Sequence, residues 1–201
     1  MKIYLVRHGQ TLFNLKRRVQ GWCDSHLSDE GVKQAIDLGY GLRVIDFVAA
    51  YSSTSERAVD TANYIINDRS ITLTTLKGLK EMNFGTLEGE YEDDVLAKDG
   101  STHDKGFVEL GGESIPLTQK RMVKTLHEIA KKHLDGNVLV VSHGGAIMCA
   151  LLGLGDTQVQ DYRDGGHHIG NCSVSVLAYD EGFTIEKIAD TSFIDKGSER
   201  R

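Results

Sequence analysis

The stretch Val138-Leu139-Val140-Val141 is the feature that most restricts the fold of this chain. Four consecutive apolar residues are typical of a strand that is buried on both faces. Such strands occur in parallel sheets, whose two faces are covered by helices. The strand ends at Ser142-His143-Gly144-Gly145, and a helix is expected from residue 144 to about residue 152. The chain is therefore expected to have an α/β fold.

The other expected elements alternate between strand and helix along the chain. The spacing of apolar residues after Ser28, Ser55 and Ser114 predicts helices that these serines cap. This alternation predicts a three-layer α/β/α sandwich with a mainly parallel central sheet. The expected strands are residues 2–6, 47–51, 71–75 and 138–141, with a hairpin at 173–179 and 183–188, and residues 196–201 are expected to be frayed.

One segment, at about residues 79–116, departs from this pattern. Its part from 79 to 113 is glycine-rich and weakly periodic, and it contains ten acidic residues and no arginine. We expect it to be an excursion over one end of the sheet. Because 201 residues is an ordinary length for one domain, residues 1–201 are expected to form a single domain.

Composition and charge exclude several classes of protein. A net charge of −6 argues against a general nucleic-acid binder, which normally has a basic face. No apolar stretch approaches the roughly 20 residues that span a bilayer, so no membrane partner is expected. Cys23, Cys149 and Cys172 are far apart and odd in number, which fits a reducing cytoplasm better than a disulfide framework. A monomer and a homodimer both remain open.

Two histidines follow apolar runs and precede glycine turns. His8 stands in Leu5-Val6-Arg7-His8-Gly9-Gln10-Thr11, and His143 follows the strand that ends at Ser142. Ligands of parallel sheets bind beyond the carboxyl ends of the strands, so one site with two imidazoles is expected. Arg7 adds a fixed positive charge suited to phosphate, and Arg57 lies in the first turn of the helix after Ser55. These residues predict chemistry on a phosphoryl group.

This constellation resembles the histidine phosphatase superfamily, which includes the cofactor-dependent phosphoglycerate mutases. Five stretches match its pattern in the right order over nearly the whole chain, which is far more specific than Arg-His-Gly alone. They are Val6-Arg7-His8-Gly9-Gln10-Thr11 with Asn14, Gln20-Gly21 to Asp24 with Leu27, Ser53 to Thr61 around Arg57, Glu81-Met82-Asn83-Phe84-Gly85 with Leu87-Glu88-Gly89, and Ser142-His143-Gly144-Gly145.

The resemblance implies roles for individual residues. His8 would be the nucleophile that becomes phosphohistidine, and Glu81 would be the general acid that protonates the leaving oxygen and then activates water. The resemblance implies a small phosphorylated metabolite as partner, with no metal ion and no other cofactor. The remaining residues would bind the phosphoryl group: Arg7, Arg57, His143, Asn14, Gln20 and the amide of Gly144.

The resemblance also bears on the choice between hydrolysis and phosphoryl transfer. Mutases of the family follow the acid with Arg-His-Tyr-Gly and carry a basic insertion, whereas Glu81 here precedes Met82-Asn83-Phe84-Gly85. Gln20 before Gly21, and the Gly111-Gly112-Glu113-Ser114 stretch, resemble the broad-specificity phosphatase branch. A phosphatase that acts on small phosphate monoesters is therefore the leading prediction.

Two other functions stay open. Gly21-Trp22-Cys23-Asp24 is similar to the Gly-Trp-x-Asp of mutases, so a cofactor-dependent phosphoglycerate mutase is the alternative. A non-catalytic phospho-ligand binder would normally lack the nucleophile or the acid, and both His8 and Glu81 are present.

Three details of the site are left open by the sequence. Glu88, Glu90 and Glu92 are alternatives to Glu81 as the acid, and Trp22 is either a wall of the substrate site or a packed aromatic residue. If the acidic segment 79–113 overhangs the site, its charge should disfavour highly anionic substrates.

Overall fold

The structure is a computed structural model that describes residues 1–67, 69–93 and 106–200. Its centre is a six-stranded sheet with the order β3-β2-β4-β1-β5-β6. The first four strands in this order are parallel, and β5 and β6 form the expected antiparallel hairpin. The strands are β1 (Lys2–Arg7), β2 (Phe47–Ser52), β3 (Leu73–Thr75), β4 (Asn137–Ser142), β5 (Val174–Asp180) and β6 (Gly182–Asp190).

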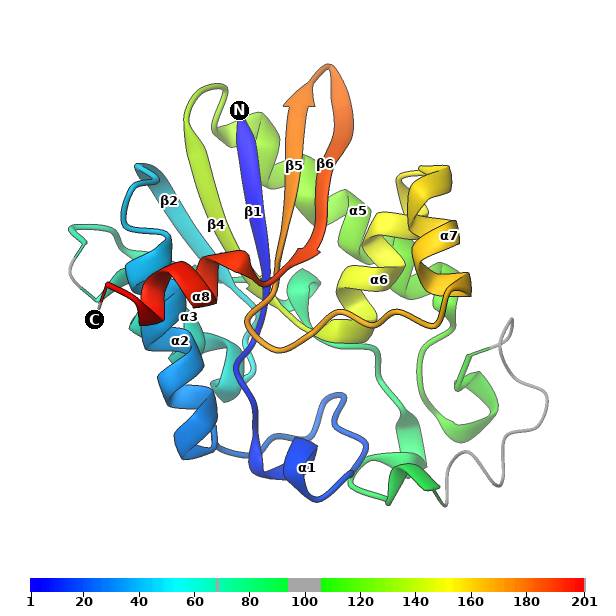
Figure 1. Cartoon of the computed structure of the whole chain (residues 1–201). Helices are drawn as coiled ribbons and strands as arrows, with labels where there is room; N and C mark the ends of the chain where they lie inside the picture. The colour runs from blue at the N-terminus through cyan, green and yellow to red at the C-terminus, as the bar shows by residue number, and fades with distance from the viewer. Residues whose placement is uncertain (68, 94–105, 201) are drawn as a thin grey trace.

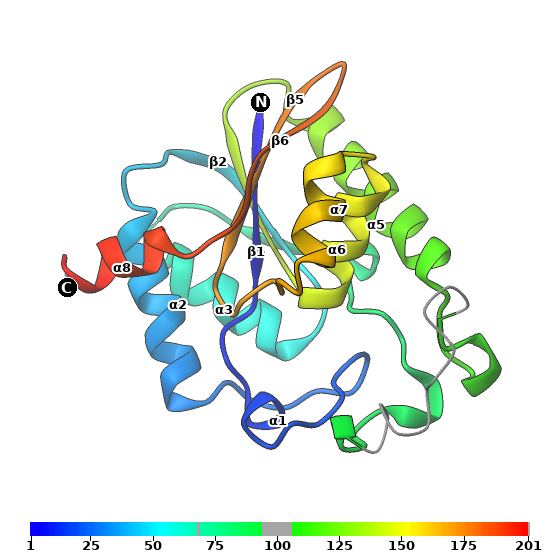
Figure 2. The same cartoon turned by 45° about the vertical axis from the view of Figure 1, so that its right-hand side comes forward.

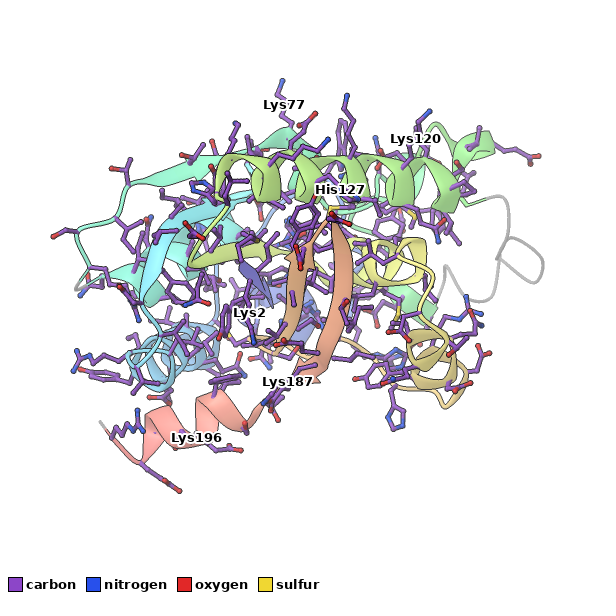
Figure 3. All side chains as sticks on the ribbon, turned by 90° about the horizontal axis from the view of Figure 1, so that it is seen from above. Lys2, Lys77, Lys120, His127, Lys187 and Lys196 are labelled. Atoms are coloured by element: carbon purple, nitrogen blue, oxygen red, sulfur yellow. The ribbon has the colours of Figure 1, made fainter. Side chains whose placement is uncertain are left out.

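Helices cover both faces of this sheet, as the continuous apolar strand predicts (Figures 1 and 2). One face packs against α2 (Asp29–Gly41), α3 (Glu56–Ile66) and α8 (Ser192–Ser198). The other face packs against α5 (Ile115–Lys132), α6 (Gly144–Gly153) and α7 (Thr157–Asp164). Figure 3 shows these layers from above, with α5 and α8 on opposite sides of the strands. The predicted three-layer α/β/α fold is confirmed.

The register of β1 and β4 brings the two predicted histidines together. Lys2 is paired with Asn137 at one end of these neighbouring strands, and Arg7 with Ser142 at the other. The next residues, His8 and His143, therefore leave the sheet side by side. The backbone amide of His8 donates to the carbonyl of Ser142 over 3.0 Å, which continues the pairing by one residue.

The described part of the acidic segment lies beyond these strand ends, beside α1 (Leu12–Leu15) (Figure 1). It pairs with the loop that follows α1, because the amide of Val19 donates to the carbonyl of Glu90 and the amide of Gly89 donates to the carbonyl of Val19. It contains the short 3-10 helices at Gly85–Leu87 and Val108–Leu110. Residues 94–105 of the segment lie outside the described residues.

Two predictions of local structure differ from the structure. The strand expected at 71–75 is only Leu73–Thr75, because Ile71 packs into the core on the α2 and α3 side before the pairing with β2 begins. Residues expected to be frayed are helical as far as Ser198, because α8 packs on α2. Gly197 makes this possible, since a Cβ there would overlap the carbonyl of Asp37. None of the described helices combines the length and the apolar character that crossing a bilayer requires.

Candidate active site

A cavity of about 440 Å³ opens at the carboxyl ends of the parallel strands. Six of the eight predicted site residues line it: Arg7, His8, Asn14, Gln20, Glu81 and Gly144. Arg57 and His143 are fully buried behind it, and the ring of His143 lies 5.2 Å from the ring of His8 between centroids. The structure therefore brings together residues from five separate stretches of the sequence.

The hydrogen bond of His8 fixes which of its nitrogens can react. Its Nδ1 lies 2.8 Å from the carbonyl oxygen of Gly9. Because a carbonyl only accepts, Nδ1 carries the proton and Nε2 keeps its lone pair. Burial, followed by the charges of Arg57 and Arg7, holds the pKa of His8 well below its ordinary value. His8 is thus a neutral imidazole with a free nucleophilic nitrogen.

His143 is the second imidazole, at the N-cap of α6. Neither of its ring nitrogens has a hydrogen-bond partner in the described protein, although the side chain is fully buried. Burial, followed by the positive charge of Arg57, holds the pKa of His143 well below its ordinary value. A neutral imidazole of this kind can donate one hydrogen bond to a phosphate oxygen.

Arg57 is held from behind by the backbone of the loop 20–24. Its two Nη atoms donate to the carbonyls of Gln20, Gly21 and Cys23 and to the Oδ1 of Asp24, at 2.8–3.3 Å. The expected cap of α3 is corrected here, because the side chain of Ser55 makes no capping hydrogen bond. Asp24 takes that role, since its Oδ2 accepts from the amide of Glu56 over 2.6 Å.

The site concentrates buried nitrogens that have no partner in the protein. Among the described residues, four buried side-chain nitrogens of the site lack a hydrogen bond: Arg7 Nε, Arg57 Nε and the two ring nitrogens of His143. Arg7 is otherwise held by a 2.6 Å hydrogen bond from Nη1 to the carbonyl of Ile169. Buried donors are rarely left unpaired, so their convergence beside His8 indicates a site for an anion.

Glu81 is buried against the first turn of α6. Its carboxylate accepts from the amides of Met82, Gly145 and Ala146 at 2.8, 2.9 and 2.6 Å. Burial raises the pKa of Glu81, and these hydrogen bonds and the charge of Arg57 oppose the rise without cancelling it. A carboxyl with a raised pKa, in the cavity that contains His8, is suited to donate a proton.

The other acidic candidates are less suited to be the acid. Glu88 does not line the cavity, and hydrogen bonds from Cys23 and from the backbone outweigh burial and lower its pKa. Glu90 is exposed and does not line the cavity either. Glu92 lines the outer part of the cavity and lies 3.7 Å from the guanidinium of Arg17.

Asn14 and Gln20 differ in how many side-chain N–H groups remain available for a hydrogen bond to a ligand. Asn14 uses its Oδ1 to accept from the amide of Thr11 and from Asn171, which leaves its Nδ2 hydrogens available. Gln20 accepts from the hydroxyl of Thr11 at 2.7 Å and donates to Ser25 at 3.0 Å, so only one N–H remains. Both side chains line the cavity.

Sequence comparison assigns the family. Residues 3–191 match the histidine phosphatase superfamily (branch 1). The chain belongs to this superfamily. It is 32% identical over 210 residues to a protein named "Probable phosphoglycerate mutase GpmB" from Yersinia pestis (strain Pestoides F), covering 97% of this chain and 95% of that protein.

Solved structures agree with this assignment and include both mutases and phosphatases. A phosphoglycerate mutase from Bacillus anthracis str. Sterne has a TM-score of 0.86 and 32% identity, over 98% of this chain and 96% of its own. A phosphoserine phosphatase from Entamoeba histolytica, in complex with 3-phosphoglyceric acid, has a TM-score of 0.80 and 26% identity, over 96% and 98% of the two chains. By their names, these two relatives of this histidine phosphatase superfamily member act on small phosphorylated metabolites.

The outer part of the cavity in this superfamily member contains residues that the sequence did not single out. The guanidinium of Arg18 stacks on Tyr91 at 4.2 Å and donates to the carbonyl of Gly89 over 2.6 Å, and no acidic residue of the described chain pairs with it. Further residues of the rim and walls are Arg163, His167, His168, Val19, Phe84, Met148 and Ile169. The adjacent pair His167-His168 was the one visible signal for them.

The charge of the acidic segment also bears on the site. Of the described acidic side chains in the segment 79–113, Glu113 pairs with Arg121, and Glu92 and Asp93 pair with Arg17. Glu90 and Glu109 form no ion pair with another described residue, and Glu92 and Asp93 share one arginine, so the described part of the segment keeps a negative charge. The expected repulsion of highly anionic substrates stays a prediction.

Trp22 is not a wall of the cavity that contains His8. Its side chain is absent from the cavity lining, and its indole nitrogen donates to the backbone carbonyl of Glu81 over 3.0 Å.

Over residues 1–67, 69–93 and 106–200, no three His, Cys, Asp or Glu side chains are grouped so that they could hold a metal ion.

Proposed function

We propose that this chain is a metal-independent phosphatase that hydrolyses small-molecule phosphate monoesters through a phosphohistidine on His8. The observation that supports it most is the arrangement at His8. Its Nε2 lone pair is free, the ring centroid of His143 lies 5.2 Å from that of His8, and Arg7, Arg57 and His143 each have a buried nitrogen without a partner. Catalysis of phosphoryl transfer consists mainly of positioning and charge stabilisation, which these groups supply.

In the first step, Nε2 of His8 attacks the phosphorus atom and the bond between phosphorus and the ester oxygen breaks. The leaving oxygen takes the proton of the Glu81 carboxyl, so that an alcohol leaves and Glu81 becomes a carboxylate. The donors of Arg7, Arg57 and His143 bind the oxygens of the phosphoryl group in flight. Asn14 and the amide of Gly144 line the same cavity and add neutral donors.

In the second step, a water molecule attacks the phosphorus of the phosphohistidine. The Glu81 carboxylate takes a proton from this water, the bond between phosphorus and Nε2 breaks, and inorganic phosphate leaves. Both His8 and Glu81 are then in their starting states. The proton remains on Nδ1 of His8 throughout, because the carbonyl of Gly9 accepts a hydrogen bond from this N–H group.

Hydrolysis is favoured over transfer by the segment after Glu81. Phe84 stands in this segment and lines the cavity, and its ring packs on Phe107 with centroids 4.8 Å apart. The Met82-Asn83-Phe84 stretch thus supplies no cation where the mutases have Arg-His. A mutase is the second candidate, because relatives that match nearly the whole chain bear that name and Gly21-Trp22-Cys23-Asp24 has the mutase pattern.

The outer cavity supports a preference among phosphate monoesters. Arg18 and Arg163 line it together with Glu92, which faces Arg17, and Arg163 pairs with Asp164 over 3.0 Å. A substrate with a second anionic group, such as a carboxylate, would meet a cation there. The phosphatase from Entamoeba histolytica was solved with 3-phosphoglyceric acid, a molecule of that class.

The test is phosphate release from a panel of monophosphate esters in the presence of a metal chelator, with wild type and His8→Ala. A parallel assay follows conversion of 3-phosphoglycerate to 2-phosphoglycerate with a bisphosphate primer. Release that resists the chelator, disappears in His8→Ala and persists in the matched control His26→Ala is the expected result. Fast isomerisation with little phosphate release would favour the mutase, and inactivity in both assays would contradict both enzymes.

A further inference from the structure

Glu88 accepts four backbone hydrogen bonds although it does not touch the cavity. Its Oε2 accepts from the amides of Gly21 and Cys23 at 3.0 Å each. Its Oε1 accepts from the amides of Trp22 at 2.7 Å and Phe84 at 3.0 Å. Three consecutive N–H groups of one loop therefore end on a single carboxylate.

The opposite side of the same loop holds Arg57. The carbonyls of Gln20, Gly21 and Cys23 accept from its guanidinium, as described above. The Gln20–Gly21 and Gly21–Trp22 peptide groups thus have Glu88 at their N–H ends and Arg57 at their C=O ends. A negative charge at the N–H ends and a positive charge at the C=O ends polarise the peptides in the same direction, so the two contacts reinforce each other.

We propose that Glu88 is a positioning residue: it fixes the loop 20–23 so that its carbonyls orient Arg57 and aim the free Nε at the phosphoryl group. This inference rests on the proposed function for the role of Arg57 in the reaction. Glu88 itself touches no reacting atom, and it acts through the loop and the guanidinium.

The chemistry of the side chain explains why this position needs a carboxylate. An ionised carboxylate only accepts, and it offers enough lone pairs for four N–H groups. A glutamine would turn an NH₂ group toward two backbone amides, so two hydrogen bonds would be replaced by a contact between donors. Gly21 allows the close approach, because a Cβ there would overlap both the carboxylate of Glu88 and the carbonyl of Met82.

Glu88 also connects this loop with the segment that contains the acid. The amide of Phe84, three residues after Glu81, is the fourth donor to Glu88. Trp22, whose amide also binds Glu88, donates its indole N–H to the carbonyl of Glu81. Loss of the Glu88 carboxylate should therefore loosen the phosphate site more than it lowers the nucleophilicity of His8.

The test is a double-mutant cycle with Glu88→Gln and Arg57→Ala, read out as the dissociation constant of inorganic phosphate and as kcat/KM. Binding can be followed by the fluorescence of Trp22, the single tryptophan of the chain. We expect each single variant to weaken phosphate binding by about 10- to 100-fold, and the double variant to be about as weak as Arg57→Ala alone. Glu90→Gln, which removes an exposed charge two residues away, should bind phosphate like wild type.

Several results would overturn the proposal. Losses that multiply in the double variant would show that Glu88 acts independently of Arg57. Normal phosphate binding in a folded Glu88→Gln variant would show that the residue has only a structural role. If Glu88→Gln does not fold, Glu88→Asp keeps the charge, and the same cycle with Arg57→Ala decides.

Phosphate binding needs no turnover, which separates this inference from the proposed function. A wild type that binds phosphate with Glu88 and Arg57 coupled, but hydrolyses no ester, would contradict the phosphatase and support the positioning role. If the wild type hydrolyses esters and the losses in phosphate binding multiply in the double variant, the phosphatase is supported and the positioning role is contradicted.

Discussion

The carboxylate of Glu81 and the backbone amide of Gly145 lie 2.9 Å apart, from Oε2 to N. Gly145 is the second residue of α6, which begins directly after His143. The candidate acid is therefore anchored to the same helix start that positions the second imidazole. Amides at a helix start stabilise the carboxylate, whereas burial stabilises the neutral acid, and the outcome is a raised pKa. Glu81 can thus hold a proton, release it and take another within one cycle.

The variant Glu81→Gln should separate these two roles of the carboxyl. We expect kcat for alkyl phosphates to fall by at least about 100-fold, because a poor leaving group needs the proton. With p-nitrophenyl phosphate, whose leaving group needs no proton, the first step should persist while water attack slows. The expected observation is a stoichiometric burst of p-nitrophenol followed by slow turnover, measured by stopped-flow absorbance.

The control for this experiment is Glu90→Gln, an exposed neighbour whose loss should leave kcat within about twofold of wild type. Equal losses for alkyl and p-nitrophenyl esters, with no burst, would mean that Glu81 is not the acid of the first step.

The pH dependence of kcat/KM should follow from the same pKa shifts. Glu81 must be protonated to donate, so the rate falls as the pH rises through its pKa, and a raised pKa moves this limb to higher pH. His8 must be neutral to attack, and its pKa lies well below the ordinary value of 6.5, so its protonation should cause no loss near pH 6.5. In Glu81→Gln the alkaline limb should disappear, while the titration of the substrate itself remains. An unchanged alkaline limb in Glu81→Gln would assign it to another group.

Much of the fold and the core of the site were predictable from local patterns. The continuous apolar run before Ser142 indicates a strand buried on both faces, and β4 is that strand in the centre of the sheet. Because neighbouring parallel strands end at the same edge, the sequence alone places the two His-Gly breaks in one site. The structure shows both side chains at that edge.

The contacts that hold Arg57 and form the outer cavity were not predictable in this way. The Ser55 hydroxyl fits the capping pattern, but Asp24 reaches the helix start from 32 residues away in the sequence. Arg18 and Arg163 carry no pattern of their own, since an arginine in a loop or on a short helix is ordinary surface composition. They line the same cavity only because α7 and the loop after α1 lie close together in the folded chain, and a local sequence pattern does not show this.

Gly21→Ala should lower both the stability of the fold and the activity. A Cβ at this position would overlap the carbonyl of Met82 and the carboxylate of Glu88, so the loop would have to move away. Overpacking of this kind costs about 1–3 kcal/mol, to be measured as the change in the free energy of unfolding by urea. The matched control is Gly182→Ala, where a Cβ would meet no atom within 4 Å and the change should stay within about 0.5 kcal/mol. Equal stabilities of the two variants would mean that the loop has room that the structure does not show.

Arg18→Ala should distinguish substrates by their second anionic group. The guanidinium is fixed on Tyr91 and on the carbonyl of Gly89 and has no acidic partner among the described residues, so its charge is available to a ligand in the cavity. A hydrogen bond to a charged group contributes about 1.5 kcal/mol at the lower end of its range, which corresponds to about a tenfold change in affinity. We therefore expect KM to rise about tenfold for a phosphate ester that carries a carboxylate, and to change less than twofold for an uncharged alkyl phosphate. Lys16→Ala removes the same charge from an exposed position outside the cavity and should change neither value. An equal rise in KM for both esters would place Arg18 at the reacting phosphate instead of at the second group.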